Sequence, residues 1–221
     1  MRVSVICRAA VVALCLAGCT VEPATQAVLD AYRLSQGGGS APHRLDPALQ
    51  YLRVVAAGQE NLLVLGYVDP AANGPVQVWY SGDGSVLRLD DGRLVGAAIR
   101  GVVDWSGVTF VNLPAWHSIG ERAEFVRIRD VSPGYRYGIR DEMHIRRIPA
   151  PDDSGLAGIA PALLTWFEES VAGGAGDGQP ARYAVEHAGT PAARVVYGEQ
   201  CLTAQYCLSW QNWPVSGGEG R

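Results

Sequence analysis

The sequence predicts an all-β domain, an antiparallel β-barrel or sandwich built of meandering hairpins, preceded by a short helix. Short segments rich in valine and leucine follow one another along most of the 221-residue chain, and few segments have helical periodicity. Turn signals separate the segments at intervals of about eight to twelve residues, which is typical of sandwiches and barrels. Two turns, 81–84 (SGDG) and 90–92 (DDG), have the residues that tight hairpins prefer.

The N-terminus has the organisation of a bacterial lipoprotein signal. Residues 9–16 form an apolar run that is too short to cross a bilayer as a helix. The run ends in Leu16-Ala17-Gly18-Cys19, which resembles a lipobox, so we expect a signal peptide over 1–18 and a membrane-anchoring lipid on Cys19. An ordinary cleaved signal and a short anchor helix are the alternatives. By the same resemblance, Thr20 favours the outer membrane of a Gram-negative cell, with the protein facing the periplasm.

The elements after the anchor follow from residue spacing. Residues 25–35 carry Val28, Leu29 and Tyr32 at helical spacing, so we expect a short amphipathic helix there. A glycine-rich linker then ends the unit that spans 19–40. The first strands are expected in five segments rich in branched apolar residues: 51–57, 61–68, 76–80, 85–89 and 93–99.

The strand pattern continues through the all-β domain, which we place at 41–221. Residues 123–130 alternate Val126 and Ile128 with two arginines, Arg127 and Arg129, which predicts a strand with the arginines on its wet face. Four further segments are expected to be strands: 135–148, which also fits a hairpin, 182–187, 193–199 and 206–213. The segment 163–171 fits a strand or a helix. The Pro/Asp/Gly-rich connection at 149–158 is the best candidate for a sub-domain boundary.

The five cysteines fall into three groups. Cys7 and Cys15 leave with the signal peptide and Cys19 takes the lipid, which leaves Cys201 and Cys207. Two thiols in an oxidising periplasm usually pair, and their spacing suits a bond across a short hairpin. Such a small loop contributes only about 2 kcal/mol in the chain-entropy model. We expect a structural disulfide, with free thiols or redox chemistry as the alternatives.

Composition and motifs point away from several function classes. The net charge is −4 and no basic run is present, which argues against nucleic acid as a partner. The sequence has no nucleophile elbow and no zinc-ligand spacing, and its four histidines are scattered. Glu168 and Glu169 are adjacent, so on a strand they face opposite ways and cannot alone form a glycosidase pair. The glycines of 173–178 fit a flexible loop better than a phosphate cradle. We therefore expect no catalytic residues, no metal and no cofactor.

Aromatic residues are the candidates for recognition. In an all-β fold, tryptophan either packs between strands or stays exposed, where it can stack on sugars or anchor an interface. Trp105 and Trp116 lie in a stretch punctuated by Gly and Pro, so we predict that they form a surface pair. A second candidate face, suited to an acidic glycan, has four members: Tyr135, Arg136, Tyr137 and Arg140.

Several segments in chain order carry a family resemblance. They are the lipobox, 28–33 (VLDAYR), 62–67 (LLVLGY), 78–95 (VWYSGDGSVLRLDDGRLV), 198–201 (GEQC) and 210–213 (WQNW). Together they resemble the YjbF/GfcB lipoproteins, which are encoded with group 4 capsule and related exopolysaccharide secretion systems. The chain departs from that family after residue 213, where Pro214, Gly217 and Gly218 stand in place of a further strand.

The resemblance implies an all-β accessory of polysaccharide export that is anchored in the outer membrane and has no assigned catalytic residues. We expect a non-enzymatic periplasmic lipoprotein that assists capsule or exopolysaccharide assembly by contacting the polysaccharide or export-machinery proteins. Two alternatives stay open. A cleft with two carboxylates beside Trp105 or Trp116 would favour a glycan-modifying hydrolase or lyase. Tryptophans that are all buried, without a sizeable exposed apolar patch, would favour a purely structural envelope protein.

Overall fold

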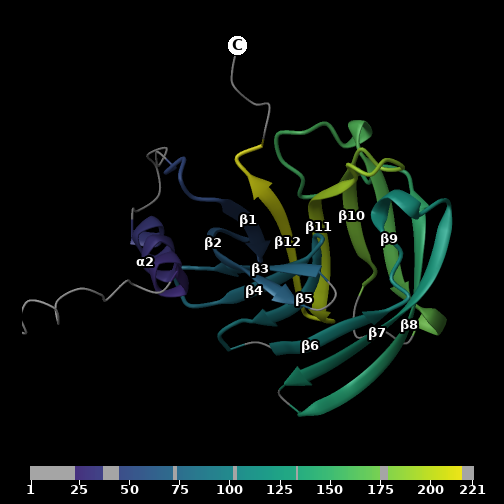
Figure 1. Ribbon diagram of the computed structural model, residues 1–221, viewed down its shortest axis with the longest axis horizontal. Coiled ribbons are helices and arrows are strands. Elements are labelled where there is room, and N and C mark those ends of the chain that lie inside the picture. Colours follow the sequence, from purple (N-terminus) through teal and green to yellow (C-terminus); the bar gives the residue numbers. More distant parts are fainter. Residues whose placement is uncertain are drawn as a thin grey trace, which may run out of the picture.

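Each strand pairs with its neighbours in the chain and the first pairs with the last, so the sheet closes into a barrel (Figure 1). The computed structural model describes residues 23–36, 45–71, 74–101, 104–132, 134–174 and 179–215. The predicted signal peptide, Cys19 and the glycine-rich linker lie outside the described residues. The structure confirms the predicted all-β fold of meandering hairpins, and the fold is a barrel rather than a sandwich.

One helix and twelve strands make up the regular structure of these ranges. They are α2 (Pro23–Gln36), β1 (Tyr51–Ala56), β2 (Gln59–Ala71), β3 (Gly74–Tyr80), β4 (Val86–Asp90), β5 (Arg93–Ala98), β6 (Asp104–Val111), β7 (Arg122–Ser132), β8 (Arg136–Ile148), β9 (Thr165–Val171), β10 (Ala181–Glu186), β11 (Arg194–Thr203) and β12 (Tyr206–Trp213). Short 3-10 turns occur at η2 (Trp116–Ser118), η3 (Pro161–Leu163) and η4 (Ala172–Gly174). The predicted helix is confirmed, 135–148 is one long strand, and 163–171 is mainly strand β9. Among the described residues, no helix is both long and apolar enough to span a membrane.

Large side chains fill the barrel and join strands that are distant in the sheet. Strands β2–β5 cross β9–β12 steeply (Figure 1). Trp105 of β6 donates its indole N–H to the carbonyl oxygen of Leu202 in β11 at 3.3 Å. Trp210 of β12 donates to the carbonyl oxygen of Gly92, between β4 and β5, at 3.1 Å. The indoles of Trp105 and Trp210 therefore each satisfy their one donor on the opposite wall.

The inner and outer faces of β7 are the reverse of the predicted ones. Arg129 is only 3% exposed, and its guanidinium donates to the Asp141 carboxylate of β8 at 2.6 Å. Arg127 donates to the same carboxylate at 2.9 Å, and both guanidinium groups lie about 5 Å from the Trp105 ring centre. The prediction of a wet arginine face was wrong because a carboxylate on the neighbouring strand neutralises both cations inside the barrel.

Helix α2 covers part of the outer surface of the barrel. Its Ala27 and Ala31 pack against Tyr51 of β1 and Val64 of β2, which are register partners on one face of the sheet. The small alanine side chains let the helix lie close to the strands. An apolar outer patch is thereby removed from water, which favours the docked helix.

The connection between β8 and β9 covers a second outer patch. Leu156, Ile159 and Leu164 pack against a cluster that includes Trp166 and Tyr197. Residues 149–158, the candidate sub-domain boundary, lie within this connection, and β8 pairs directly with β9. One barrel therefore continues on both sides of 149–158.

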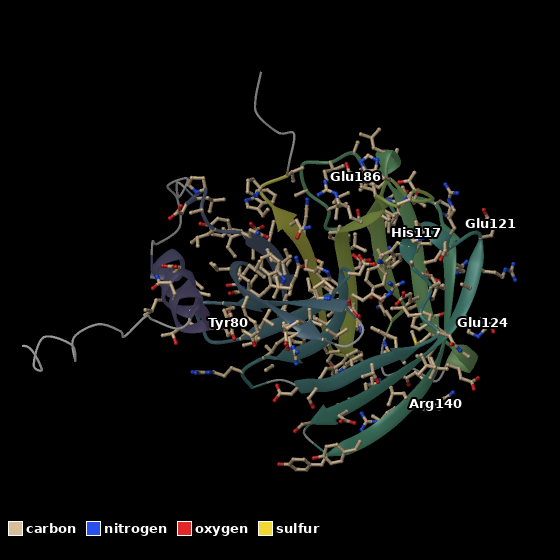
Figure 2. All side chains as sticks on the ribbon, viewed as in Figure 1. Tyr80, His117, Glu121, Glu124, Arg140 and Glu186 are labelled. Atoms are coloured by element: carbon tan, nitrogen blue, oxygen red, sulfur yellow. A yellow bond between two sulfur atoms is a disulfide. The ribbon has the colours of Figure 1, made fainter. Side chains whose placement is uncertain are left out.

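The two ends of the barrel differ. We call the end that carries the β2–β3, β4–β5, β6–β7, β8–β9 and β10–β11 connections the mouth end, and the opposite end, with the β7–β8 turn, the far end. Glu186, at the mouth end of β10, and Arg140, on β8, lie on opposite sides of the molecule (Figure 2). The distinction matters because one end holds a large cavity and the other carries the exposed tyrosines.

Candidate ligand site at the mouth of the barrel

A cavity of about 940 Å³ opens at the mouth end, and we call it the mouth cavity. Strands β1–β4, β11 and β12 and the β4–β5 turn line it. The polar and aromatic side chains of its lining include Gln77, Trp79, Asp90, Asp91, Arg194, Trp210, Asn212 and Trp213. Barrel mouths are a common place for ligand sites, and this volume suits a ligand of several sugar units or similar size.

Side chains alternate between the two faces of each strand, and this places an amide nearer the opening than an indole on both β3 and β12. Trp79 belongs to the barrel core, and Gln77 lies two residues before it on the same face of β3. Trp210 likewise belongs to the core, and Asn212 follows two residues later on β12. All four residues line the cavity. The floor is therefore aromatic and the wall above it carries hydrogen-bonding amides.

The floor also carries a buried donor without a protein partner. Trp79 is 1% exposed, and its indole N–H makes no hydrogen bond within the described part of the chain. A buried N–H that lacks an acceptor costs free energy, on the order of 1–3 kcal/mol. Trp79 lines the mouth cavity, but its indole nitrogen is shielded from solvent, so this vacant donor lies below the surface that a ligand contacts.

The rim is formed by the β4–β5 turn, which two indoles hold in place. Asp91 and Gly92 have φ angles of 45° and 80°, as a tight hairpin turn requires. The Trp116 indole donates to the carbonyl oxygen of Asp91 at 2.9 Å, and Trp210 donates to that of Gly92. A Cβ atom on Gly92 would lie 2.3 Å from the Cβ of Val195, so only glycine fits this crossing.

Two carboxylates of this rim line the cavity and are partly desolvated. Burial raises the pKa of Asp90 above its usual value, although the Arg93 guanidinium opposes the shift. Burial also raises the pKa of Asp91, where Arg93 and His117 oppose the shift and Asp90 adds to it. Because these carboxylates are incompletely hydrated, they interact favourably with hydrogen-bond donors of a ligand.

A buried ion pair supports the rim from inside the barrel. Arg93 donates to the Glu169 carboxylate at 2.8 Å, with both side chains almost fully buried. The Arg93 guanidinium carbon lies 3.5 Å from the ring centre of Trp116, which is an intimate cation–π contact. Glu169 therefore holds Arg93, and Arg93 holds the Trp116 ring. The Trp116 N–H in turn fixes the Asp91 carbonyl of the turn.

The predicted surface pair, Trp105 and Trp116, is buried instead. Their exposed fractions are 4% and 1%. The Gly and Pro residues around them occur where the polypeptide turns back toward the barrel. The wide interior of the barrel is filled by such large side chains. Trp213, which the sequence did not single out, is only partly buried and lines the mouth cavity.

The predicted tyrosine–arginine face lies at the far end. Tyr135 and Tyr137 are 73% and 70% exposed, and Arg136 and Arg140 are also exposed. Tyr135, Arg136 and Tyr137 lie at the β7–β8 turn and Arg140 follows on β8, and we call the region of these four residues the far-end tip. Its role in binding stays a prediction.

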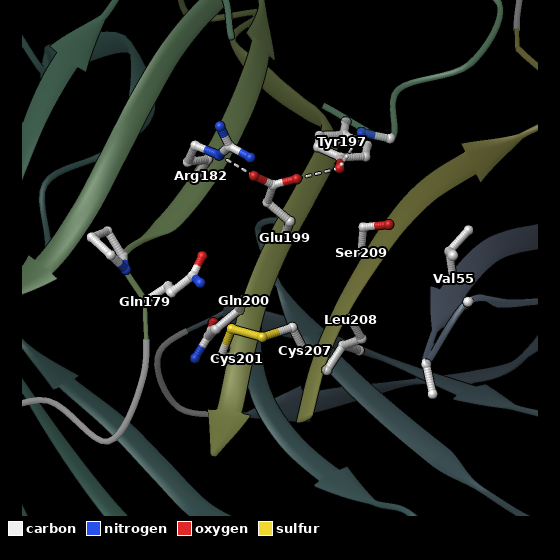
Figure 3. A pocket seen from close by; sticks show the side chains of 14 residues that line it. Val55, Gln179, Arg182, Tyr197, Glu199, Gln200, Cys201, Cys207, Leu208 and Ser209 are labelled. Atoms are coloured by element: carbon white, nitrogen blue, oxygen red, sulfur yellow. Dashed lines mark hydrogen bonds and ion pairs between the residues drawn. A yellow bond between two sulfur atoms is a disulfide. The ribbon is translucent and has the colours of Figure 1, made fainter. Parts of the chain in front are cut away.

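The predicted disulfide is present beside a second, smaller hollow. Cys201 and Cys207 are register partners on β11 and β12 and are joined through their sulfur atoms (Figure 3). The hollow, about 280 Å³, lies on the outer face of these strands. Its Arg182 pairs with Glu199 and, at 2.6 Å, with Asp153. Because these charges satisfy one another, the hollow offers less to a ligand than the mouth cavity.

Sequence reasoning missed the mouth residues, although a signal was present. The sequence indicates Asp90 and Asp91 only as turn residues, and it leaves the tryptophans of β3 and β12 as either core or surface residues. Two segments of the family resemblance, 78–95 and 210–213, line this one cavity from different strands. Among the described residues, no group of three or more His, Cys, Asp or Glu side chains could hold a metal ion.

No protein-family model and no curated protein sequence matches the chain. Among solved structures, the chain is similar to the crystal structure of the hypothetical lipoprotein YmcC from Escherichia coli (K12). The TM-score is 0.52 and the identity 14%, over 86% of this chain and 89% of that chain. The similarity shows a shared fold.

Proposed function

We propose that this protein is a lipid-anchored envelope protein that binds part of a polysaccharide chain in its mouth cavity and assists capsule or exopolysaccharide assembly without cleaving the chain. The observation that carries the proposal is the composition of that cavity. Indole faces stack on sugar rings, and amides and carboxylates hydrogen-bond to sugar hydroxyls. The mouth cavity combines these groups, and Trp213, which is only partly buried, is the most accessible of its indoles.

The proposed location rests on separate support. The Leu-Ala-Gly-Cys motif before residue 20 predicts a lipid anchor, and Thr20 favours the outer membrane. The solved structure with a similar fold is itself described as a lipoprotein. The segments 78–95 and 210–213, which resemble a family encoded with polysaccharide secretion systems, both border the mouth cavity.

Binding to an export-machinery protein is a second candidate function, and the far-end tip favours it. Tyr135 and Tyr137 are strongly exposed, and tyrosine and arginine are enriched at protein interfaces. A polysaccharide in the mouth and a protein at the far end would occupy opposite ends of the barrel. The two functions are therefore separable by substitution.

The proposal is tested by measuring surface and secreted polysaccharide in a deletion strain that carries variants of the gene. Wild type should restore the amount, whereas Cys19→Ser and the double variant Gln77→Ala/Asn212→Ala should not, at equal protein levels by immunoblot. If the Tyr135→Ala/Tyr137→Ala variant fails to restore the polysaccharide while the Gln77→Ala/Asn212→Ala variant restores it, the result would point to protein docking at the far-end tip. A change in chain length without a change in amount would indicate a glycan-modifying enzyme. A deletion without effect on either quantity would contradict the proposal.

A further inference from the structure

The mouth cavity has an excess of negative charge. Asp90 and Asp91 contribute two carboxylates from the β4–β5 turn. Gly74, at the start of the neighbouring strand β3, also lines the cavity, and a Cβ atom there would lie 3.5 Å from Asp90 Oδ1. The Asp90 carboxylate therefore lies close to Gly74, at an edge of the cavity that both residues line.

The nearby arginines do not cancel this charge, because each has a carboxylate of its own. Arg194 also lines the cavity, and its guanidinium pairs with Glu186 at 2.6 Å. Arg93, behind the rim, pairs with Glu169 at 2.8 Å. Among the described residues, the two arginine–glutamate pairs cancel each other's charge. The charges of Asp90 and Asp91 therefore remain as a net negative charge at the cavity.

From this arrangement we infer that the mouth cavity selects a polysaccharide segment that carries a free, protonated amino sugar. This inference rests on the proposed function and names the class of sugar that the site takes. The ammonium group of a hexosamine is a compact cation with three donors, which suits a pair of carboxylates. Units with carboxylate or phosphate groups are repelled by the same aspartates.

The aromatic floor reinforces the selection. A cation near an indole face gains a further attraction, and Trp79 and Trp210 line the cavity beside the acidic turn. The carboxylates thus recognise the amino group while the floor holds the ring.

The test is a set of tryptophan-fluorescence titrations of the full-length lipidated protein in detergent micelles. The probes are glucosamine, N-acetylglucosamine and galacturonate oligomers of equal length, at one pH and ionic strength. The glucosamine oligomer should bind about tenfold more tightly than the acetylated one, as one charge-assisted interaction predicts. The galacturonate oligomer should bind most weakly.

Asp90→Asn/Asp91→Asn should abolish the preference for glucosamine but keep binding of the acetylated oligomer. Asparagine suits the positive φ of residue 91, so the turn is retained. The matched control, Glu142→Gln/Asp152→Asn, removes two exposed carboxylates elsewhere and should keep the preference. Equal binding of the three oligomers, or tightest binding of galacturonate, would overturn the inference and leave the proposed function standing. Binding of none would overturn both.

Discussion

At the residue scale, Gly92 is the point where the rim touches the opposite wall. A side chain there would collide with Val195, and the φ of 80° is itself unfavourable for other residues. Gly84 provides a matched comparison, because its φ is 85° but nothing lies within 4 Å of an added Cβ. The two glycines separate the cost of backbone conformation from the cost of overpacking.

We predict that Gly92→Ala lowers the free energy of unfolding by about 3 kcal/mol or more, since overpacking adds to the backbone cost. Gly84→Ala should lower it by only about 1 kcal/mol. Urea denaturation followed by tryptophan fluorescence measures both. Equal losses in the two variants would show that the contact between Gly92 and Val195 is absent in solution.

Glu168 and Glu169 form a second matched pair of residues. The sequence placed them on opposite faces of a strand, and the structure agrees: Glu169 is buried against Arg93, whereas Glu168 pairs with the exposed Arg146. Glu169→Gln leaves Arg93 buried without its counter-charge and should lower the free energy of unfolding by about 3–5 kcal/mol. Glu168→Gln should cost about 1 kcal/mol or less. Similar losses by urea denaturation would contradict the buried pair.

At the element scale, β7 and β8 show what periodicity can and cannot predict. The alternation of 123–130 correctly indicated a strand, but hydrophobicity alone assigned Arg127 and Arg129 to the wrong face. The deciding residue, Asp141, lies on β8, and its place opposite Arg127 depends on the register of the pair. Periodicity within one segment contains no information about that register.

The Asp141 cluster should make stability depend on acid pH. Burial acts to raise the pKa of Asp141, but the Arg129 and Arg127 guanidinium groups outweigh it and hold the pKa below its usual value. A carboxyl with a lowered folded-state pKa stabilises the fold above its unfolded pKa, about 4. That contribution is lost as the pH falls through the folded-state value.

The stability difference between wild type and Asp141→Asn should therefore be largest above about pH 4 and should shrink in stronger acid. Urea unfolding across a pH series measures it. Glu142→Gln removes an exposed carboxylate from the adjacent position of β8 and should leave the acid profile as in wild type. A difference for Asp141→Asn that does not change with pH would refute the proposed charge cluster.

At the scale of the whole molecule, the fold was more predictable than the site. Valine-rich segments and hairpin turns such as 81–84 identify strands locally, and short turns leave few alternatives to a meander. The mouth cavity, however, joins β3 and the β4–β5 turn to β12, more than one hundred residues later in the chain. Trp116 was misplaced for the same reason, because its burial depends on Arg93 and other residues from distant strands.

The arrangement of the whole barrel separates two surfaces. The mouth cavity lies at one end, with an aromatic floor and an acidic rim, and the far-end tip lies at the other. Helix α2, which follows the predicted anchor, packs on the side of the barrel against β1 and β2. A polysaccharide held in the mouth would therefore leave the tyrosines of the tip free to contact a partner protein.

The most direct test of the proposed function is a crystal structure of the protein bound to an oligosaccharide from the surface or secreted polysaccharide of the same strain. We predict a sugar unit in the mouth cavity, with its ring on the aromatic floor and its polar groups near Gln77, Asn212 and the Asp90–Asp91 rim. A sugar bound at the far-end tip or on the outer face, with the mouth cavity holding only solvent, would contradict the proposed function.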